Sequence, residues 1–105
     1  MARFDVYRNT GKHVEQTPYL LDVQTDLLHG LETRIVVPMR RHDRFQVEKL
    51  PGNLIPRFTI EGVECLLETP KLAAVPLRLL KTPVTSLAAS RLEIIAALDF
   101  LLQGF

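Results

Sequence analysis

The hydrophobic pattern of this chain changes its period once, near Ser86. Before that point, short runs alternate apolar and polar side chains, and this period of two is typical of half-buried β-strands. After it, apolar residues recur every three or four positions, as they do on one face of an α-helix. This order of patterns predicts an α+β, mainly β domain in which a strongly bent antiparallel sheet is followed by one C-terminal α-helix.

Prolines and glycines divide the first part of the chain into strand candidates. Pro38 is expected to end one of them, and Glu61-Gly62 predicts a hairpin turn between two others. A turn is also expected over residues 50–53, and the piece before it is expected to be irregular or a short edge element. The expected strands cover residues 3–8, 19–24, 33–37, 55–60, 63–69 and 75–79, the last being the final strand.

Polar and apolar side chains alternate within residues 19–24. Leu21 and Val23 are expected to face the core, so Asp22 and Gln24 are expected to face outward. Residues 3–8 follow the same rule, with Phe4 pointing inward.

The C-terminal helix has two possible starts. Thr85 or Ser86 can cap it, whereas Ser90 with Glu93 forms a rival capping box one turn later. Gly104 is suited to end the helix in a left-handed conformation. The apolar face and its neighbours include Leu87, Arg91, Ile94, Leu98, Leu101 and Leu102.

The 105 residues have room for one domain, residues 1–105, and the net charge of +1 gives no overall attraction to nucleic acid. Cys65 is the only cysteine, which excludes an intramolecular disulfide and fits a reducing cytosol. No apolar run approaches the roughly 20 residues that span a bilayer, and no cleavable signal is apparent. We therefore expect a cytoplasmic protein without a membrane partner.

Candidate catalytic and metal-binding residues are scattered. The histidines His13, His29 and His42 stand in three loops without the spacing of a metal site, so they are expected to be solvated. Asp22 and Asp26 could form a carboxylate pair, but are better explained as acceptors of turn amides or as solvent-facing groups. Cys65 lies in an apolar strand, where a thiol is buried and inert. The sequence thus predicts no enzymatic activity, no cofactor and no metal.

Three arginines, Arg40, Arg41 and Arg44, could contact phosphate or an acidic partner. Short basic runs are usually solvated, and no aromatic residues are interleaved here to stack on bases. A small nucleic-acid-binding barrel nevertheless stays open as an alternative.

At two places the chain has more apolar side chains than one sheet can cover. Leu27 and Leu28 are adjacent in a connection, so at least one of them is hard to bury. Residues 100–105 are apolar around most of the last helical turn. The surplus indicates either a homodimer interface alone or that interface together with a binding surface for another protein.

Five segments, taken in order and spacing, resemble the CcdB toxins of bacterial toxin–antitoxin modules. The resemblance implies an SH3-like barrel of antiparallel strands with a small extra sheet and one C-terminal helix, assembled as a homodimer. The segments are Phe4-Asp5-Val6-Tyr7, residues 21–28 (LDVQTDLL), residues 33–38 (TRIVVP), residues 74–77 (AVPL) and residues 94–105 (IIAALDFLLQGF).

The resemblance also implies a function without enzymatic activity. CcdB toxins bind the A subunit of DNA gyrase, trap it on cleaved DNA as a topoisomerase poison and block replication. A cognate antitoxin wraps the toxin with a disordered tail, and the complex represses its own operon, so that operator DNA is contacted only through the antitoxin. Such modules serve plasmid maintenance.

Residue by residue, the resemblance implies a gyrase-binding set and a dimer interface. At one position the chain departs from well-studied members, which carry a tryptophan where Gln103 stands; glutamine can donate a hydrogen bond but cannot stack on an arginine. A family member that binds antitoxin and co-represses its operon without poisoning gyrase is therefore a second alternative. The implied gyrase-binding residues are Leu27, Leu28, Asp99, Leu102, Gln103, Gly104 and Phe105, and the implied dimer interface comprises Leu98, Leu101 and Phe105.

Overall fold

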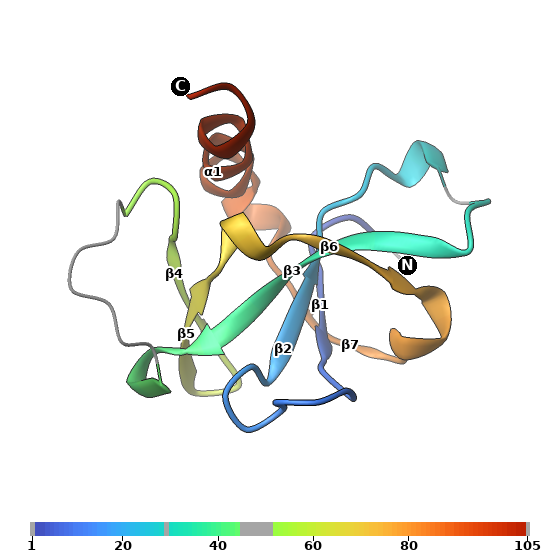
Figure 1. The fold of residues 1–105 in the computed structure, drawn as a ribbon, viewed down its shortest axis with the longest axis horizontal. Coiled ribbons are helices and arrows are strands. Elements are labelled where there is room, and N and C mark those ends of the chain that lie inside the picture. The colour runs from blue at the N-terminus through green and yellow to red at the C-terminus, as the bar shows by residue number, and fades with distance from the viewer. Residues whose placement is uncertain (1, 29, 45–51, 105) are drawn as a thin grey trace.

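Within residues 2–28, 30–44 and 52–104, which the computed structural model describes, seven strands form one curled antiparallel sheet followed by one α-helix (Figure 1). The sheet order is β4-β5-β3-β2-β1-β7, and β6 pairs with β3 beside this path. The predicted α+β, mainly β class is confirmed. The strands are β1 (Asp5–Arg8), β2 (Tyr19–Asp22), β3 (Thr33–Arg41), β4 (Arg57–Ile60), β5 (Val63–Leu67), β6 (Ala73–Pro76) and β7 (Pro83–Ser86), and the helix is α1 (Arg91–Gln103).

The long strand β3 organises the sheet. One of its edges pairs with β2, and the other pairs first with β6 and then with β5. Pro38 lies inside β3, opposite Leu20, so the prediction that Pro38 ends the strand is wrong. The Pro38 carbonyl accepts a hydrogen bond from the Glu68 N–H at 2.9 Å, so the nitrogen without a proton faces the same edge. The strand that pairs with this edge changes at Pro38 from β6 to β5, so the missing N–H of proline costs no hydrogen bond of the sheet.

Both faces of the sheet are covered. On one face, α1 packs on the main core, which includes Val6, Leu21, Val37 and Ile94. On the other face, Tyr7, Leu20 and Val36 form a second cluster with Leu80, which follows the short 3-10 helix Leu77–Leu79.

Double coverage explains why one prediction about residues 19–24 is wrong. Asp22 and Gln24 were expected to face water, but both are buried. Asp22 lies on the second face of the sheet, and its oxygen accepts a hydrogen bond from the Gln24 N–H at 3.0 Å. The predicted alternation of side chains between the two faces of β2 is correct. The assumption that only one face of the sheet is covered is wrong.

The hairpin between β4 and β5 is confirmed. Glu61 and Gly62 have φ angles of 51° and 79°, the left-handed pair that a two-residue hairpin turn requires. The Glu61 carboxylate accepts a hydrogen bond from the Tyr19 hydroxyl at 2.7 Å, which ties the turn to β2. Burial and this hydrogen bond raise the pKa of Tyr19 to about 12.

The segment before the helix differs from the prediction. The strand expected over residues 75–79 is shifted to β6, and residues 77–79 form a 3-10 turn. The final strand is β7, which begins at Pro83; proline is tolerated there because β7 is an edge strand and Pro83 is its first residue. The turn expected over residues 50–53 and the piece before it lie largely outside the described residues.

The helix begins later than the period change at Ser86. The Ser86 hydroxyl accepts a hydrogen bond from the Ala88 N–H at 3.1 Å and thereby starts a 3-10 turn, Ala88–Ser90, that leads into α1. Ser90 occupies the N-cap position, but its side chain makes no capping hydrogen bond. Gly104 ends α1 with a φ of 83°, and its N–H donates to the Phe100 carbonyl at 2.9 Å, as predicted.

Candidate functional site

Part of the connection between β2 and β3 exposes leucine side chains; we call residues 25–32 the leucine loop. It contains the 3-10 helix Asp26–Leu28. Leu27 is 87% exposed and Leu28 is 48% exposed, so the prediction that at least one of them stays unburied is confirmed. Leu31, also 48% exposed, is a third exposed apolar side chain, and the sequence analysis did not predict it. Its position between Gly30 and Glu32, in a turn, could have indicated that it is exposed.

Beneath the leucine loop lies a buried ion pair. Arg34 Nη2 is 2.7 Å from Asp22 Oδ2, and the two side chains are 3% and 0% exposed. The same nitrogen lies 3.3 Å from Asp26 Oδ1. Burial raises the pKa of the Asp22 carboxyl, and the Arg34 guanidinium and the Gln24 backbone N–H oppose that rise. The two carboxylates considered as a pair thus share one arginine, an arrangement suited to holding structure.

The C-terminal half of α1 carries the second group of predicted site residues. Ile94 and Ala97 are buried, and Leu101, which continues the same stripe one turn later, is half-buried. Leu98 packs against the main core.

Beyond this stripe the helix is exposed. Leu102 is 72% exposed, and Gln103 and Gly104 are also exposed. The Gln103 side chain donates a hydrogen bond to the half-buried Asp99 at 3.4 Å. Phe105, assigned to both the gyrase-binding set and the dimer interface, lies outside the described residues.

The two groups are not brought together within one protomer. In Figure 1 the C-terminal end of α1 and the leucine loop lie well apart, although both project beyond the same side of the sheet. A partner that contacts both groups must therefore span the sheet or meet surfaces from two copies.

Two of the three arginines considered as a nucleic-acid patch, Arg40 and Arg41, do not share one face, and the side chain of Arg44 lies outside the described part of the chain. Arg40 and Arg41 are adjacent in β3, so their side chains leave opposite faces of the strand. Arg41 is paired with Asp43, with nitrogen–oxygen distances of 3.1 and 3.0 Å. The described residues at this end of β3 thus do not present a uniform basic surface.

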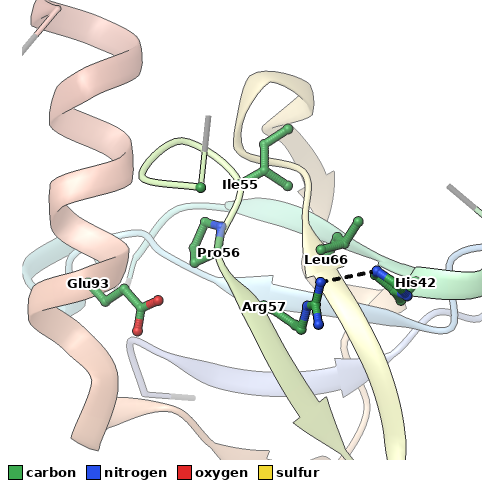
Figure 2. A pocket seen from close by; sticks show the side chains of 7 residues that line it. His42, Ile55, Pro56, Arg57, Leu66 and Glu93 are labelled. Atoms are coloured by element: carbon green, nitrogen blue, oxygen red, sulfur yellow. Dashed lines mark hydrogen bonds between the residues drawn. The ribbon is translucent and has the colours of Figure 1, made fainter. Parts of the chain in front are cut away.

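A cavity of about 430 Å³ opens between the start of α1 and the β4–β5 hairpin (Figure 2). Ile55, Pro56 and Leu66 supply its apolar lining, and Arg57 and Glu93 line it from the hairpin and the helix. Arg57 contacts His42 at 3.2 Å between nitrogens and pairs with Glu64 at 3.2 Å. The arrangement contains no nucleophile beside a base among the described residues.

The remaining candidates for chemistry are dispersed. Among residues 2–28, 30–44 and 52–104 no group of three His, Cys, Asp or Glu side chains could hold a metal ion. His13 is exposed, and His29 lies outside the described residues. Cys65 is buried, as predicted, and burial raises the pKa of its thiol to about 11, which disfavours the reactive thiolate. None of the helices in the described part of the chain is long and apolar enough to cross a membrane.

Comparison with known protein families places the chain in one of them. A family model described as CcdB protein matches residues 3–104, which is essentially the whole chain. No curated protein matches the chain.

Proposed function

The chain belongs to the CcdB family of toxins from toxin–antitoxin modules, and on that premise we propose that it binds the A subunit of DNA gyrase and traps the enzyme on cleaved DNA. The consequence is a block of replication. The toxin acts by binding and performs no chemistry of its own. It works in the cytoplasm, where its target is found.

The observation that carries this proposal is the pair of exposed apolar surfaces that project beyond the sheet. Leu27 and Leu28 occupy one of them, and Leu102 next to Gln103 occupies the other. Exposed apolar groups of this kind favour binding of a protein partner, because water is released when they are covered. Asp99 and Gln103 supply polar groups that orient the contact.

The proposal includes three further partners. A second copy of the chain covers the stripe that ends at Leu101. A cognate antitoxin neutralises the toxin, and the resulting complex represses its own operon with the antitoxin contacting operator DNA. Such a pair serves plasmid maintenance, because the more labile antitoxin must be replaced continuously.

The function is tested with purified gyrase, ATP and supercoiled plasmid. We expect the protein to increase the amount of linear DNA that is covalently attached to gyrase. Omitting gyrase is the control, and the plasmid should then stay intact. Hydrolysis of DNA or RNA without gyrase would contradict the proposal and indicate an enzyme. Antitoxin binding without linear DNA would instead support the alternative of a co-repressor that does not poison gyrase, which Gln103 keeps open.

The dimer is tested by Leu101→Asp. This leucine continues the stripe of Ile94 and Ala97 past the point where the sheet buries it. We expect the unchanged protein to sediment at equilibrium with twice the mass of the 11.9 kDa chain. The aspartate should weaken the dimer by about tenfold or more, because an unpaired charge would be desolvated at the interface.

Leu92→Asp on the same helix is the matched control. Leu92 lies nine residues before Leu101, on the opposite side of α1, so a charge there should leave the dimer intact. A monomer in the unchanged protein would refute the homodimer, and an unchanged mass for Leu101→Asp would place the interface elsewhere.

A further inference from the structure

We propose that four side chains beneath the leucine loop, Asp22, Gln24, Asp26 and Arg34, act as a loop clamp that holds Leu27 and Leu28 in a conformation ready to bind gyrase. The inference rests on the proposed function, since it assigns positioning residues for the same surface. The resemblance assigned none of these four residues to gyrase binding. One of them, Gln24, reaches Leu28 through a hydrogen bond to its backbone carbonyl.

Arg34 is the centre of the loop clamp. Its Nη2 atom approaches Asp22 Oδ2 on β2 at 2.7 Å, Asp26 Oδ1 at the start of the loop at 3.3 Å, and the Gln24 carbonyl at 3.1 Å. One nitrogen therefore joins a residue of the sheet to the first turn of the loop. Because Arg34 and Asp22 are buried, their ion pair is shielded from water and salt.

Gln24 makes the second connection. Its Oε1 accepts a hydrogen bond from the Ile35 N–H on β3 at 3.0 Å, and its Nε2 donates to the Leu28 carbonyl at 3.4 Å. The side chain thus spans from β3 to one of the exposed leucines.

The N-terminal segment adds a third connection through Asp26. The Arg3 backbone N–H donates to Asp26 Oδ1 at 2.9 Å, and Arg3 Nε donates to the Val23 carbonyl at 2.9 Å. Asp26 therefore receives donors from two distant parts of the chain, although its own side chain is 57% exposed.

The bonds within the loop itself are long. The Leu28 N–H reaches the Thr25 carbonyl at 3.3 Å, and the Leu31 N–H reaches the Leu28 carbonyl at 3.4 Å. Folding back onto apolar surface lowers the free energy of exposed leucine side chains. Long hydrogen bonds within the loop therefore do little to keep these side chains exposed to water. A loop that is ordered before binding loses less entropy on binding. The loop clamp adds to that order through the 2.9 Å bond from the Arg3 N–H to Asp26 and through additional contacts from Arg34 and Gln24 that are as long as the internal bonds.

The roles within the loop clamp can be separated by burial. Removing Arg34 or Asp22 leaves an uncompensated buried charge and destabilises the whole fold. Asp26 is half-exposed, so its replacement removes the contacts to Arg34 and Arg3 while the Asp22–Arg34 pair stays in place. Asp26→Ala is therefore the informative variant.

We expect Asp26→Ala to bind the gyrase A dimerisation fragment roughly tenfold more weakly, since only a fraction of the molecules would hold the binding conformation. Most of the loss should lie in the association rate, because the bound contacts are unchanged. The thermal midpoint should fall by no more than about 4 °C, because Asp26 is a largely exposed surface residue. Amide hydrogen exchange at Leu28 and Leu31 should become faster in the variant without gyrase present.

Two further variants are controls. Asp26→Asn keeps an acceptor oxygen for the Arg3 N–H and should restore affinity to within about threefold of the unchanged protein. Asp43→Ala removes an equally exposed aspartate that pairs with Arg41 far from the loop, and it should change neither binding nor exchange. Undiminished association of Asp26→Ala, or unchanged exchange at Leu28 and Leu31, would overturn the loop clamp. Failure of the unchanged protein to bind gyrase would overturn the proposed function, and the exchange measurement would still decide whether the loop clamp orders the loop.

Discussion

Deleting residues 103–105 is expected to abolish binding to the gyrase A dimerisation fragment while the domain stays folded. Gln103 and Gly104 are exposed, and the described side-chain contact of Gln103 is a hydrogen bond to Asp99 on the helix surface. Their removal costs little buried area, so the thermal midpoint and antitoxin binding should be nearly unchanged. Central contacts dominate interface energetics, so the truncated protein should show no binding that the titration detects. Isothermal titration against the fragment measures this loss.

A substitution at the same end tests the chemistry of the contact. Gln103→Trp provides an aromatic face and should tighten binding to a gyrase that offers an arginine opposite it, by about 0.5–2 kcal/mol. Leu92→Asp, near the start of the same helix, is the control that should leave gyrase affinity unchanged. If the truncated protein bound as tightly as the full chain, the contact would lie elsewhere, and the leucine loop would be the first place to examine.

The second large effect concerns stability: Arg34→Met should destabilise the fold by about 3–5 kcal/mol, because it leaves the Asp22 carboxylate buried without a cation. Asp22 is 0% exposed, so water cannot replace the lost partner. Denaturation by urea, followed by circular dichroism, gives the free energy of unfolding.

Two comparisons isolate the cause of that loss. Arg57→Met removes an arginine that is 56% exposed and pairs with Glu64, and it should cost about 1 kcal/mol or less. The double variant Arg34→Met with Asp22→Leu removes both buried charges and should recover much of the stability. A loss below about 1 kcal/mol for Arg34→Met would show that the buried ion pair contributes little.

The fold class was predictable because patterns of period two and 3.6 depend on local geometry. The hairpin at Glu61-Gly62 and the helix end at Gly104 were predictable for the same reason, since both require left-handed residues. Pro38 shows where such reasoning fails. Its effect depends on which strand lies beside it, and the change of neighbour from β6 to β5 is a property of the whole sheet.

Burial of charged residues was the other unpredictable feature. Asp22 alternates with Leu21 as a solvent-facing residue would, and the sequence does not reveal that Leu80 and its neighbours cover the second face. Arg34 therefore passed unnoticed in a β-branched run. Exposure of Leu27 and Leu28 was predictable, because adjacent residues cannot both point to one face, whereas the family resemblance alone supplied their proposed partner.

The pairing of β1 with β7 determines when during synthesis the sheet can be completed. Asp5 pairs with Ser86, so one edge of the first strand has no neighbour until the last strand has been made. At about 5–20 residues per second, synthesis of the intervening chain takes roughly 4–16 s. Such distant pairing also slows folding, because a long loop must close before the strands meet. The sheet of this domain therefore cannot close along β1 before almost the whole chain has been made.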